Sequence, residues 1–135
     1  MKIQEVKTNN SLIKIDNFFT KMWWDLFDIH LENQIQYYKK CDIYYFAENW
    51  EILSAIIYVK KDNFNYIRRF GTLSNHQWKW LWSKLLNYVL GKYSWDFHLT
   101  ADKNKVEYYK KFWFIETWEK KLIWNEYAIK MIKVN

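Results

Sequence analysis

The chain of 135 residues contains no proline, two glycines and one cysteine, and these scarcities limit what the protein can be. The single Cys41 cannot build a disulfide framework or a cysteine-based metal cluster, and it suits a reducing compartment. The longest aliphatic stretch, residues 52–59, is far shorter than a membrane span, and the first seven residues lack the apolar core of a signal peptide. We therefore expect a soluble, cytoplasmic protein with no membrane partner.

The scarcity of glycine coincides with an excess of tryptophan. Ten tryptophans stand against two glycines, whereas average usage predicts about nine glycines in a chain of this length. Some bacterial lineages decode UGA as glycine, and translating such a gene with a table that reads UGA as tryptophan would produce this imbalance. The missing proline and the 19 Lys, 14 Ile and 12 Asn indicate an AT-rich gene, which is compatible with recoding. The alternative is a genuinely tryptophan-rich protein.

Several tryptophans fall where the backbone is expected to need glycine. Asn49 and Trp50 lie between two apolar runs, where a two-residue hairpin turn requires positive φ and Asn-Gly is the strongest signal. Trp113 follows a helical pattern and precedes an apolar residue. Glycine is common at such a position, because the residue just past a helix often adopts the left-handed backbone conformation. Trp95 and Trp124 fall between predicted elements, where turn residues are common. These positions favour glycine over tryptophan on conformational grounds alone.

Length and charge indicate one ordinary domain. A chain of 135 residues supports a single core, so we expect residues 1–135 to form one domain. The formal net charge of +6 would suit a polyanionic partner. The lysines are scattered in pairs along the chain, however, and scattered lysines are typical of a solvated surface. Nucleic acid is therefore not the expected partner.

The hydrophobic periodicity predicts an α+β domain. Predicted strands cover residues 2–7, 42–47, 51–60, 65–72, 96–101, 114–119 and 125–134. Predicted helices cover the segment around Ile13 to Phe19, residues 31–40, a segment that follows Ser74 and Asn75 and ends near Gly91, and residues 103–112. The order is β-α-α-β-β-β-α-β-α-β-β. Both alternating sets in 51–60 are mostly apolar, which indicates a central strand, and the helical crossover makes 96–101 parallel to 65–72.

The segment between strand 65–72 and the following helix resembles a phosphate-binding loop. Trp78, Trp80 and Trp82 alternate there, and glycine at all three would expose successive backbone N–H groups beside the positive end of a helix dipole. Glycine is needed because any Cβ holds the ligand away from the amides. Three indoles in these positions would block such a site.

With glycine restored, residues 77–83 resemble the Arg/Gln-x-x-Gly-x-Gly/Ala acetyl-CoA loop of the GNAT superfamily of N-acetyltransferases. Residues 108–114 resemble that family's Phe-Tyr-Glu-Lys-Leu-Gly-Phe segment. Residues 70–72 occupy its Leu-Ala-Val strand end, five residues before the loop's Arg/Gln. The resemblance covers roughly residues 40–120 at the motif level. It implies a mixed, mostly antiparallel sheet with flanking helices and a parallel strand pair at the cofactor slot.

The resemblance also implies a function. The protein would move an acetyl group from acetyl-CoA, its co-substrate, to a primary amine by direct attack on the thioester, with no metal. Tyr109 matches the family's general acid, which protonates the departing thiolate. Asn104 matches a cofactor contact near the last helix. The cofactor-binding residues implied are Phe70, Gly71, Thr72, Gln77, Trp78, Lys79, Trp80, Leu81, Trp82, Ser83 and Asn104.

The general base departs from the family pattern. Many family members carry a carboxylate on the strand before the loop, whereas residues 65–70 contain no acid. His98 on the neighbouring strand is the candidate base, either directly or through water, although a lone strand histidine is more often structural. Arg68 and Arg69 would either steer an acidic acceptor or sit solvated on the surface.

Two other functions stay open at this point. The basic charge and 22% aromatic content suit a module that binds single-stranded nucleic acid. A catalytically impaired acetyltransferase scaffold that only binds partners becomes the leading interpretation if the ten tryptophans are genuine. The acceptor amine, whether a small molecule or a peptide, is not identified by any motif, and a homodimer is compatible with the sequence.

Overall fold

The computed structural model describes the chain except residues 1, 23–30, 74–78, 93–94, 124–125 and 135. Its strands are β1 (Gln4–Glu5), β2 (Asp42–Glu48), β3 (Glu51–Lys60), β4 (Phe64–Thr72), β5 (Asp96–Asp102), β6 (Ile115–Ile123) and β7 (Glu126–Lys133). The helices are α1 (Asn9–Met22), α2 (Leu31–Tyr38), α3 (Lys79–Leu90) and α4 (Val106–Lys110), and the 3-10 turn η3 (Lys103–Lys105) precedes α4. This order of elements confirms the predicted one.

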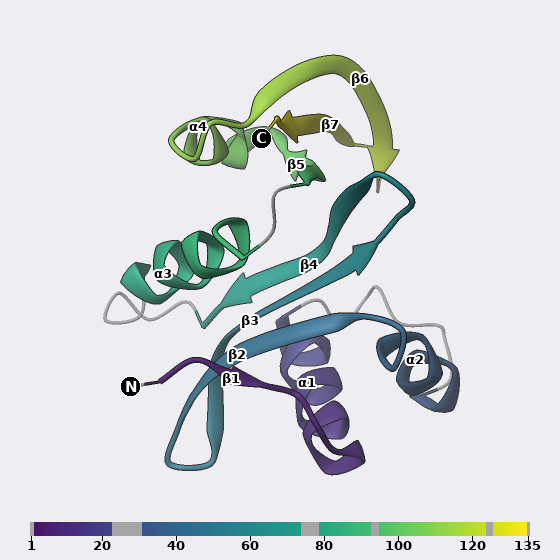
Figure 1. Cartoon of the computed structure of the whole chain (residues 1–135), viewed down its shortest axis with the longest axis vertical. Coiled ribbons are helices and arrows are strands. Elements are labelled where there is room, and N and C mark those ends of the chain that lie inside the picture. Colours follow the sequence, from purple (N-terminus) through teal and green to yellow (C-terminus); the bar gives the residue numbers. More distant parts are fainter. Residues whose placement is uncertain (1, 23–30, 74–78, 93–94, 124–125, 135) are drawn as a thin grey trace.

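All seven strands form one sheet in the order β1-β2-β3-β4-β5-β7-β6. Neighbouring strands are antiparallel except β4 and β5, which run parallel because α3 carries the chain between them. Figure 1 shows α1 and α2 together on one side of β2 to β4, and α3 on the other side. The predicted mixed, mostly antiparallel sheet with a single parallel pair is therefore confirmed.

Strand β3 is covered on both faces, as its sequence predicted. Leu53, Ile56 and Tyr58 belong to the core under α3 and α4, whereas Ala55 and Ile57 belong to the core under α1 and α2. The α3–α4 core also contains Tyr44, Phe46, Ile67, Phe70, Leu81, Leu85, Leu86, Val89, Leu90, Phe97, Leu99, Ala101, Val106, Tyr109, Phe114 and Met131. The α1–α2 core also contains Leu12, Ile15, Phe18, Phe19, Tyr38, Ile43 and Ile52. Many of the aromatic residues therefore form core and are not free for stacking on bases.

Several predicted elements are shorter in the structure, and two of them differ most. Strand β1 covers two residues instead of 2–7: Gln4 and Glu5 pair with β2, and the contact ends with the Val6 N–H, which donates to the Ile43 carbonyl. The helix predicted over 103–112 is divided into η3 and α4. The helix tightens at its end, where the Lys111 and Phe112 N–H groups donate to carbonyls three residues back. Within the described part of the chain, no helix combines the length and apolarity of a membrane span.

Positive φ falls on tryptophan and not on glycine in this fold. Among the described residues, four other than glycine have positive φ: Asn49 (49°), Trp50 (66°), Trp113 (72°) and Trp118 (68°). Both glycines of the sequence are described, and neither has positive φ. The three indoles are 90%, 80% and 88% exposed, so they contribute little to packing that would offset the cost of the left-handed backbone.

Each of these tryptophans occupies a position that glycine normally fills. Asn49 and Trp50 form the two-residue turn between β2 and β3, which confirms the predicted hairpin. At the end of α4, the Phe114 N–H donates to the Tyr109 carbonyl and the Trp113 N–H to the Lys110 carbonyl. That pattern is the Schellman motif, whose left-handed residue is Trp113.

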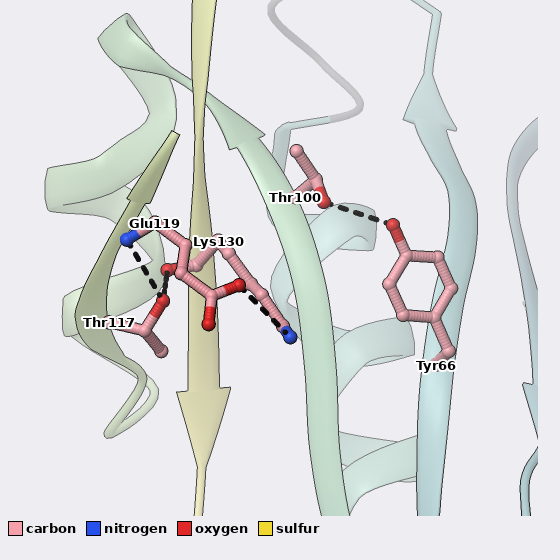
Figure 2. Close-up of polar contacts among 5 residues, drawn as sticks. All are labelled: Tyr66, Thr100, Thr117, Glu119 and Lys130. Carbon is pink, nitrogen blue, oxygen red and sulfur yellow. Dashed lines mark hydrogen bonds and ion pairs between the residues drawn. The ribbon is translucent and has the colours of Figure 1, made fainter. Parts of the chain in front are cut away.

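Trp118 lies in a β-bulge that the sequence alone did not indicate. Three residues of β6, Thr117 to Glu119, lie opposite Lys130 alone on β7. The Thr117 hydroxyl donates to the Lys130 carbonyl at 3.1 Å and accepts from the Glu119 N–H at 3.4 Å, as Figure 2 shows. A bulge of this kind often holds glycine in the left-handed conformation. Trp118 is thus a further tryptophan at a position where the backbone conformation favours glycine.

Candidate functional site

The parallel strands β4 and β5 pair at only three positions and then diverge. The register joins Phe64 to Asp96, Asn65 to Phe97 and Tyr66 to His98. From Ile67 onwards β4 has no backbone partner on β5, while its antiparallel pairing with β3 continues to Thr72. The result is a wedge between two co-directional strands, with Tyr66 and His98 at its closed end.

A side-chain hydrogen bond spans the start of this wedge. The Tyr66 hydroxyl lies 3.0 Å from the Thr100 hydroxyl of β5, and Figure 2 shows the two side chains meeting between the strands. Phe97, Leu99 and Ala101 of β5 point into the α3–α4 core, so the alternation of a strand directs His98 and Thr100 to the opposite face. The bond between Tyr66 and Thr100 therefore lies on the face away from α3.

The end of β4 leaves backbone groups facing the wedge. The Leu73 N–H donates to the Leu53 carbonyl of β3 at 2.9 Å, and the Ser54 hydroxyl donates to the Gly71 carbonyl at 3.1 Å. Backbone groups two residues apart in a strand point the same way, so those of Gly71 are directed towards β3. By the same alternation, the N–H and C=O groups of Phe70 and Thr72 are directed towards the wedge.

Helix α3 begins beside this strand end. The described helix begins at Lys79, and the backbone N–H groups in the first turn of an α-helix have no partner within the helix. These amides belong to the predicted phosphate-binding residues Lys79, Trp80, Leu81 and Trp82, and Ser83 is the next residue of the helix. The predicted cap at Ser74 and Asn75, the loop residues Gln77 and Trp78, and Trp124 lie outside the described residues.

The indole of Trp82 fills the space between α3, the end of β4 and α4. It stacks on Tyr108 with ring centroids 4.6 Å apart and meets Phe70 edge to face at 5.2 Å. The Lys105 ammonium lies 4.4 Å from its ring centroid. Its Nε1 is buried and has no hydrogen-bond partner in the described part of the structure. An indole N–H normally finds a partner when it is buried, so this side chain is poorly suited to its site.

The other alternating tryptophan of α3 behaves differently. Trp80 is exposed, and the Lys84 ammonium lies 5.0 Å from its ring centroid. Leu81 between the two tryptophans is fully buried in the α3–α4 core. Of the described tryptophans in this segment, Trp82 alone packs against both β4 and α4.

Tyr109, the candidate acid, lies in the α3–α4 core. It is 7% exposed and packs against Phe114 and Tyr108. Burial raises the pKa of the Tyr109 phenol, and the neighbouring Tyr108 and Asp102 act in the same direction, so it keeps its proton at neutral pH. Tyr108 is less buried, and its hydroxyl lies 3.3 Å from the Ser83 hydroxyl at the start of α3.

His98, the candidate base, lies on the other face of the sheet. Its ring stacks on Phe64 with centroids 3.9 Å apart. Burial and the nearby Lys130 lower the pKa of the imidazole, while Asp96 and Glu119 act in the opposite direction. A lowered pKa leaves His98 neutral at pH 7, which is the form that accepts a proton. Tyr109 and His98 thus lie on opposite sides of the sheet, with His98 at the closed end of the wedge.

Asn104 lies exposed in η3 at the approach to α4. No group of three or more His, Cys, Asp or Glu side chains that could hold a metal ion occurs among the residues that the structure describes.

A polar cluster under α1 and α2 was missed by the sequence analysis. The Arg69 guanidinium of β4 donates a hydrogen bond to the Tyr38 hydroxyl of α2. Asp16 of α1 is buried beside them, and burial raises the pKa of its carboxyl while Arg69 and Tyr38 act in the opposite direction. No local motif links residues from α1, α2 and β4, so only their contact in the fold reveals the cluster.

Comparison with known proteins supports the fold and nothing narrower. No protein-family model matches the sequence, and no curated protein matches it. Among solved structures, the aminoglycoside 6'-N-acetyltransferase from Enterococcus faecium has a TM-score of 0.80 at 14% identity, covering 98% of this chain and 96% of that one.

Two further solved structures give the same result. An acyl-CoA N-acyltransferase from Pseudomonas aeruginosa has a TM-score of 0.78 at 13% identity, with 98% and 97% of the two chains covered. An aminoglycoside 6'-N-acetyltransferase complexed with coenzyme A has a TM-score of 0.81 at 13% identity, with 98% and 96% covered. The chain therefore has the fold of the GNAT-family N-acetyltransferases.

Proposed function

We propose that this protein is an acetyl-CoA-dependent N-acetyltransferase that acts on a primary amine. The observation that carries the proposal is the divergence of β4 and β5 after Tyr66 and His98, next to the first turn of α3. A slot between co-directional strands, bordered by free backbone groups and a helix N-terminus, suits an extended amide-containing arm that ends in a pyrophosphate. The similarity to solved acyltransferases, one of them complexed with coenzyme A, is consistent with this.

The cofactor would be held mainly by backbone groups. Amides at the start of α3 would bind the pyrophosphate, and Phe70 and Thr72 would pair with the pantetheine arm. A backbone N–H at the end of β4 would also polarise the thioester carbonyl, as in an oxyanion hole. Glycine at 78, 80 and 82 fits this arrangement, whereas the indole of Trp82 occupies the space between β4 and α4.

The chemistry needs a base on one side of the thioester and an acid on the other. The acceptor amine would lose a proton to His98, directly or through water, and its nitrogen would attack the carbonyl carbon. The carbon–sulfur bond would break, and the leaving thiolate would take a proton from Tyr109. The positions of these residues on opposite faces of the sheet suit this division of roles.

The tryptophans favour a second candidate function if they are the natural residues of the protein. If Trp82 is genuine, its contacts with Phe70 and Tyr108 would exclude the cofactor, and the protein would be an acetyltransferase-like scaffold without activity. We infer instead that the organism inserts glycine at these positions. The positive φ of Trp50, Trp113 and Trp118 supports that inference independently of the cofactor site. A cytoplasmic location would suit an enzyme that uses acetyl-CoA and carries one free cysteine.

One comparison tests the function. The thermal unfolding midpoint is measured with and without acetyl-CoA for the printed chain and for a variant with glycine at 78, 80 and 82. We expect acetyl-CoA to raise the midpoint of the variant only, because a ligand stabilises the folded state that binds it. Equal behaviour of the two proteins would refute the blocking role of the tryptophans. The codons of the ten tryptophans provide a second check, since UGG at Trp80 and Trp82 would exclude recoding.

A further inference from the structure

Strand β4 directs two consecutive arginines to the same face of the sheet. Successive side chains of a strand normally point to opposite faces. The pairing of β4 with β3 shifts register here, since Ile57 pairs with Arg69 and Tyr58 with Ile67, so Arg68 has no partner on β3. The Arg68 guanidinium lies 5.9 Å from the Tyr37 ring centroid, and that of Arg69 lies 5.6 Å from the Tyr38 ring centroid. Both tyrosines belong to α2, so the bulge turns both arginines towards that helix.

The two arginines have different surroundings. Arg69 is half-buried, donates a hydrogen bond to Tyr38 and lies near the buried carboxyl of Asp16. Its charge is therefore balanced within the α1–α2 core. The cluster lies next to the point where β4 leaves β5.

Arg68, in contrast, is exposed, and its guanidinium lies over the partly exposed ring of Tyr37 at cation–π distance. Within the part of the chain that the structure describes, no carboxylate lies within 4.0 Å of its guanidinium. An arginine held over an aromatic ring is partly ordered before a ligand arrives, which lowers the entropic cost of binding. The guanidinium presents a planar set of donors that matches a carboxylate.

The position of Arg68 relates it to the wedge. It lies two residues after Tyr66, where pairing with β5 ends, and two residues before Phe70, which is about 7 Å along the strand. Its side chain points to the α1–α2 face, whereas the first turn of α3 lies on the other face. If the pyrophosphate binds at α3 as proposed, an acceptor amine would reach the thioester from the face that carries Arg68 and His98.

We propose that Arg68 binds a carboxylate of the acceptor, so that the acceptor is an amino-acid-like molecule carrying both a primary amine and a carboxylate. This inference rests on the proposed N-acetyltransferase function and narrows its substrate class. It separates this protein from enzymes that act on polycationic amines, because the exposed charge of Arg68 repels such molecules. The sequence alone left the role of the arginine pair open, and the fold assigns a different role to each.

The test uses two ligands that differ only by a carboxylate, lysine and cadaverine, titrated into the full chain by calorimetry. Arg68 lies on the face away from Trp82, so the titration can use either the tryptophan-containing chain or the variant with glycine at 78, 80 and 82. We expect lysine to bind about tenfold more tightly than cadaverine, the preference that one charge-assisted carboxylate contact supplies. The variant R68Q should lose the preference. The variant K61Q, which removes an exposed positive charge elsewhere, should keep it.

Equal affinity for the two ligands, absence of binding by both, or a preference that survives in R68Q would overturn the role of Arg68. Thermal unfolding of R68Q verifies that the variant is folded. Stabilisation by acetyl-CoA is measured separately on the glycine variant. Failure of the carboxylate preference with acetyl-CoA binding intact therefore rejects only this proposal, whereas failure of acetyl-CoA binding rejects the transferase function.

Discussion

The indole of Trp82 stacks on the ring of Tyr108, with centroids 4.6 Å apart and planes 19° from parallel. This contact joins the first turn of α3 to α4 across the end of β4. In the proposed enzyme, the cofactor arm would pass through the same space. In the chain with tryptophan at position 82, the stack therefore occupies the space that the cofactor arm would need. Removing the indole provides the most direct test of the site.

Replacing Trp82 alone by glycine should restore part of the cofactor site. We expect W82G to gain measurable affinity for acetyl-CoA, because the space beside Phe70 and Tyr108 becomes free. Isothermal titration of acetyl-CoA measures the effect. The matched control is W95G, which removes an exposed tryptophan outside the loop and should not bind. Binding by W95G but not by W82G would contradict the assignment of Trp82 as the obstructing side chain.

Glycine at the left-handed positions should stabilise the fold. In W113G and W118G, the strain of about 1 to 2 kcal/mol for a side chain with positive φ disappears. The greater flexibility of unfolded glycine opposes this by about 0.5 to 1 kcal/mol. We expect each variant to gain about 0.5 to 1 kcal/mol in free energy of unfolding, measured by urea denaturation. The control is W95G: the φ of Trp95 is not positive, so this variant should show no gain in free energy of unfolding. A loss of stability in W113G and W118G would count against glycine as the natural residue at these positions.

Removing the hydroxyl group of Tyr109 should impair the chemical step more than cofactor binding. In the variant with glycine at 78, 80 and 82, we expect Y109F to lower kcat about 100-fold with any amine that the protein acetylates, in the range of general-acid catalysis. The dissociation constant of acetyl-CoA should change little. Y108F is the control, since the Tyr108 hydroxyl contacts only Ser83 among the bonds observed. A larger kcat loss in Y108F would move the acid role to Tyr108.

The pKa of His98 predicts an acid limb in the rate. Burial and Lys130 lower the pKa of this imidazole below its ordinary value of 6.5, so it is neutral at pH 7 and becomes protonated only in more acidic solution. If His98 is the base, kcat/KM should fall as pH falls through that lowered pKa, and H98Q should lack this limb. The variant K130M should move the limb to higher pH, because Lys130 opposes protonation. A limb unchanged in H98Q would exclude His98 as the base.

The same shift predicts a stability effect with a defined sign. The unfolded chain takes up a proton at His98 near pH 6.5, whereas the folded protein does so only at lower pH. The unfolded state therefore binds more protons in this window, and the free energy of unfolding decreases as pH falls through it. H98Q should remove this part of the pH dependence in urea denaturation at several pH values.

Local patterns were sufficient to predict the elements and their order. Alternating apolar residues on both faces of residues 51–60 predicted a central strand, and Asn49-Trp50 predicted the turn before it, because these signals depend only on neighbours along the chain. The parallel arrangement of β4 and β5 followed from the helix between them. Boundaries were less accurate. The helix predicted over 103–112 begins as the 3-10 turn η3 and ends at Lys110, where the Schellman bonds at Trp113 and Phe114 end α4.

The sequence by itself determined the order of elements and the motifs that resemble an acetyltransferase, since both depend on residue type and spacing. Only the tertiary structure decided that Arg69 pairs with Tyr38 while Arg68 stays exposed, that His98 and Tyr109 lie on opposite faces, and that Trp118 adopts positive φ in a bulge. These properties arise from the register of paired strands and from helices packing across them. Such contacts join residues far apart in the chain, and no local pattern encodes them.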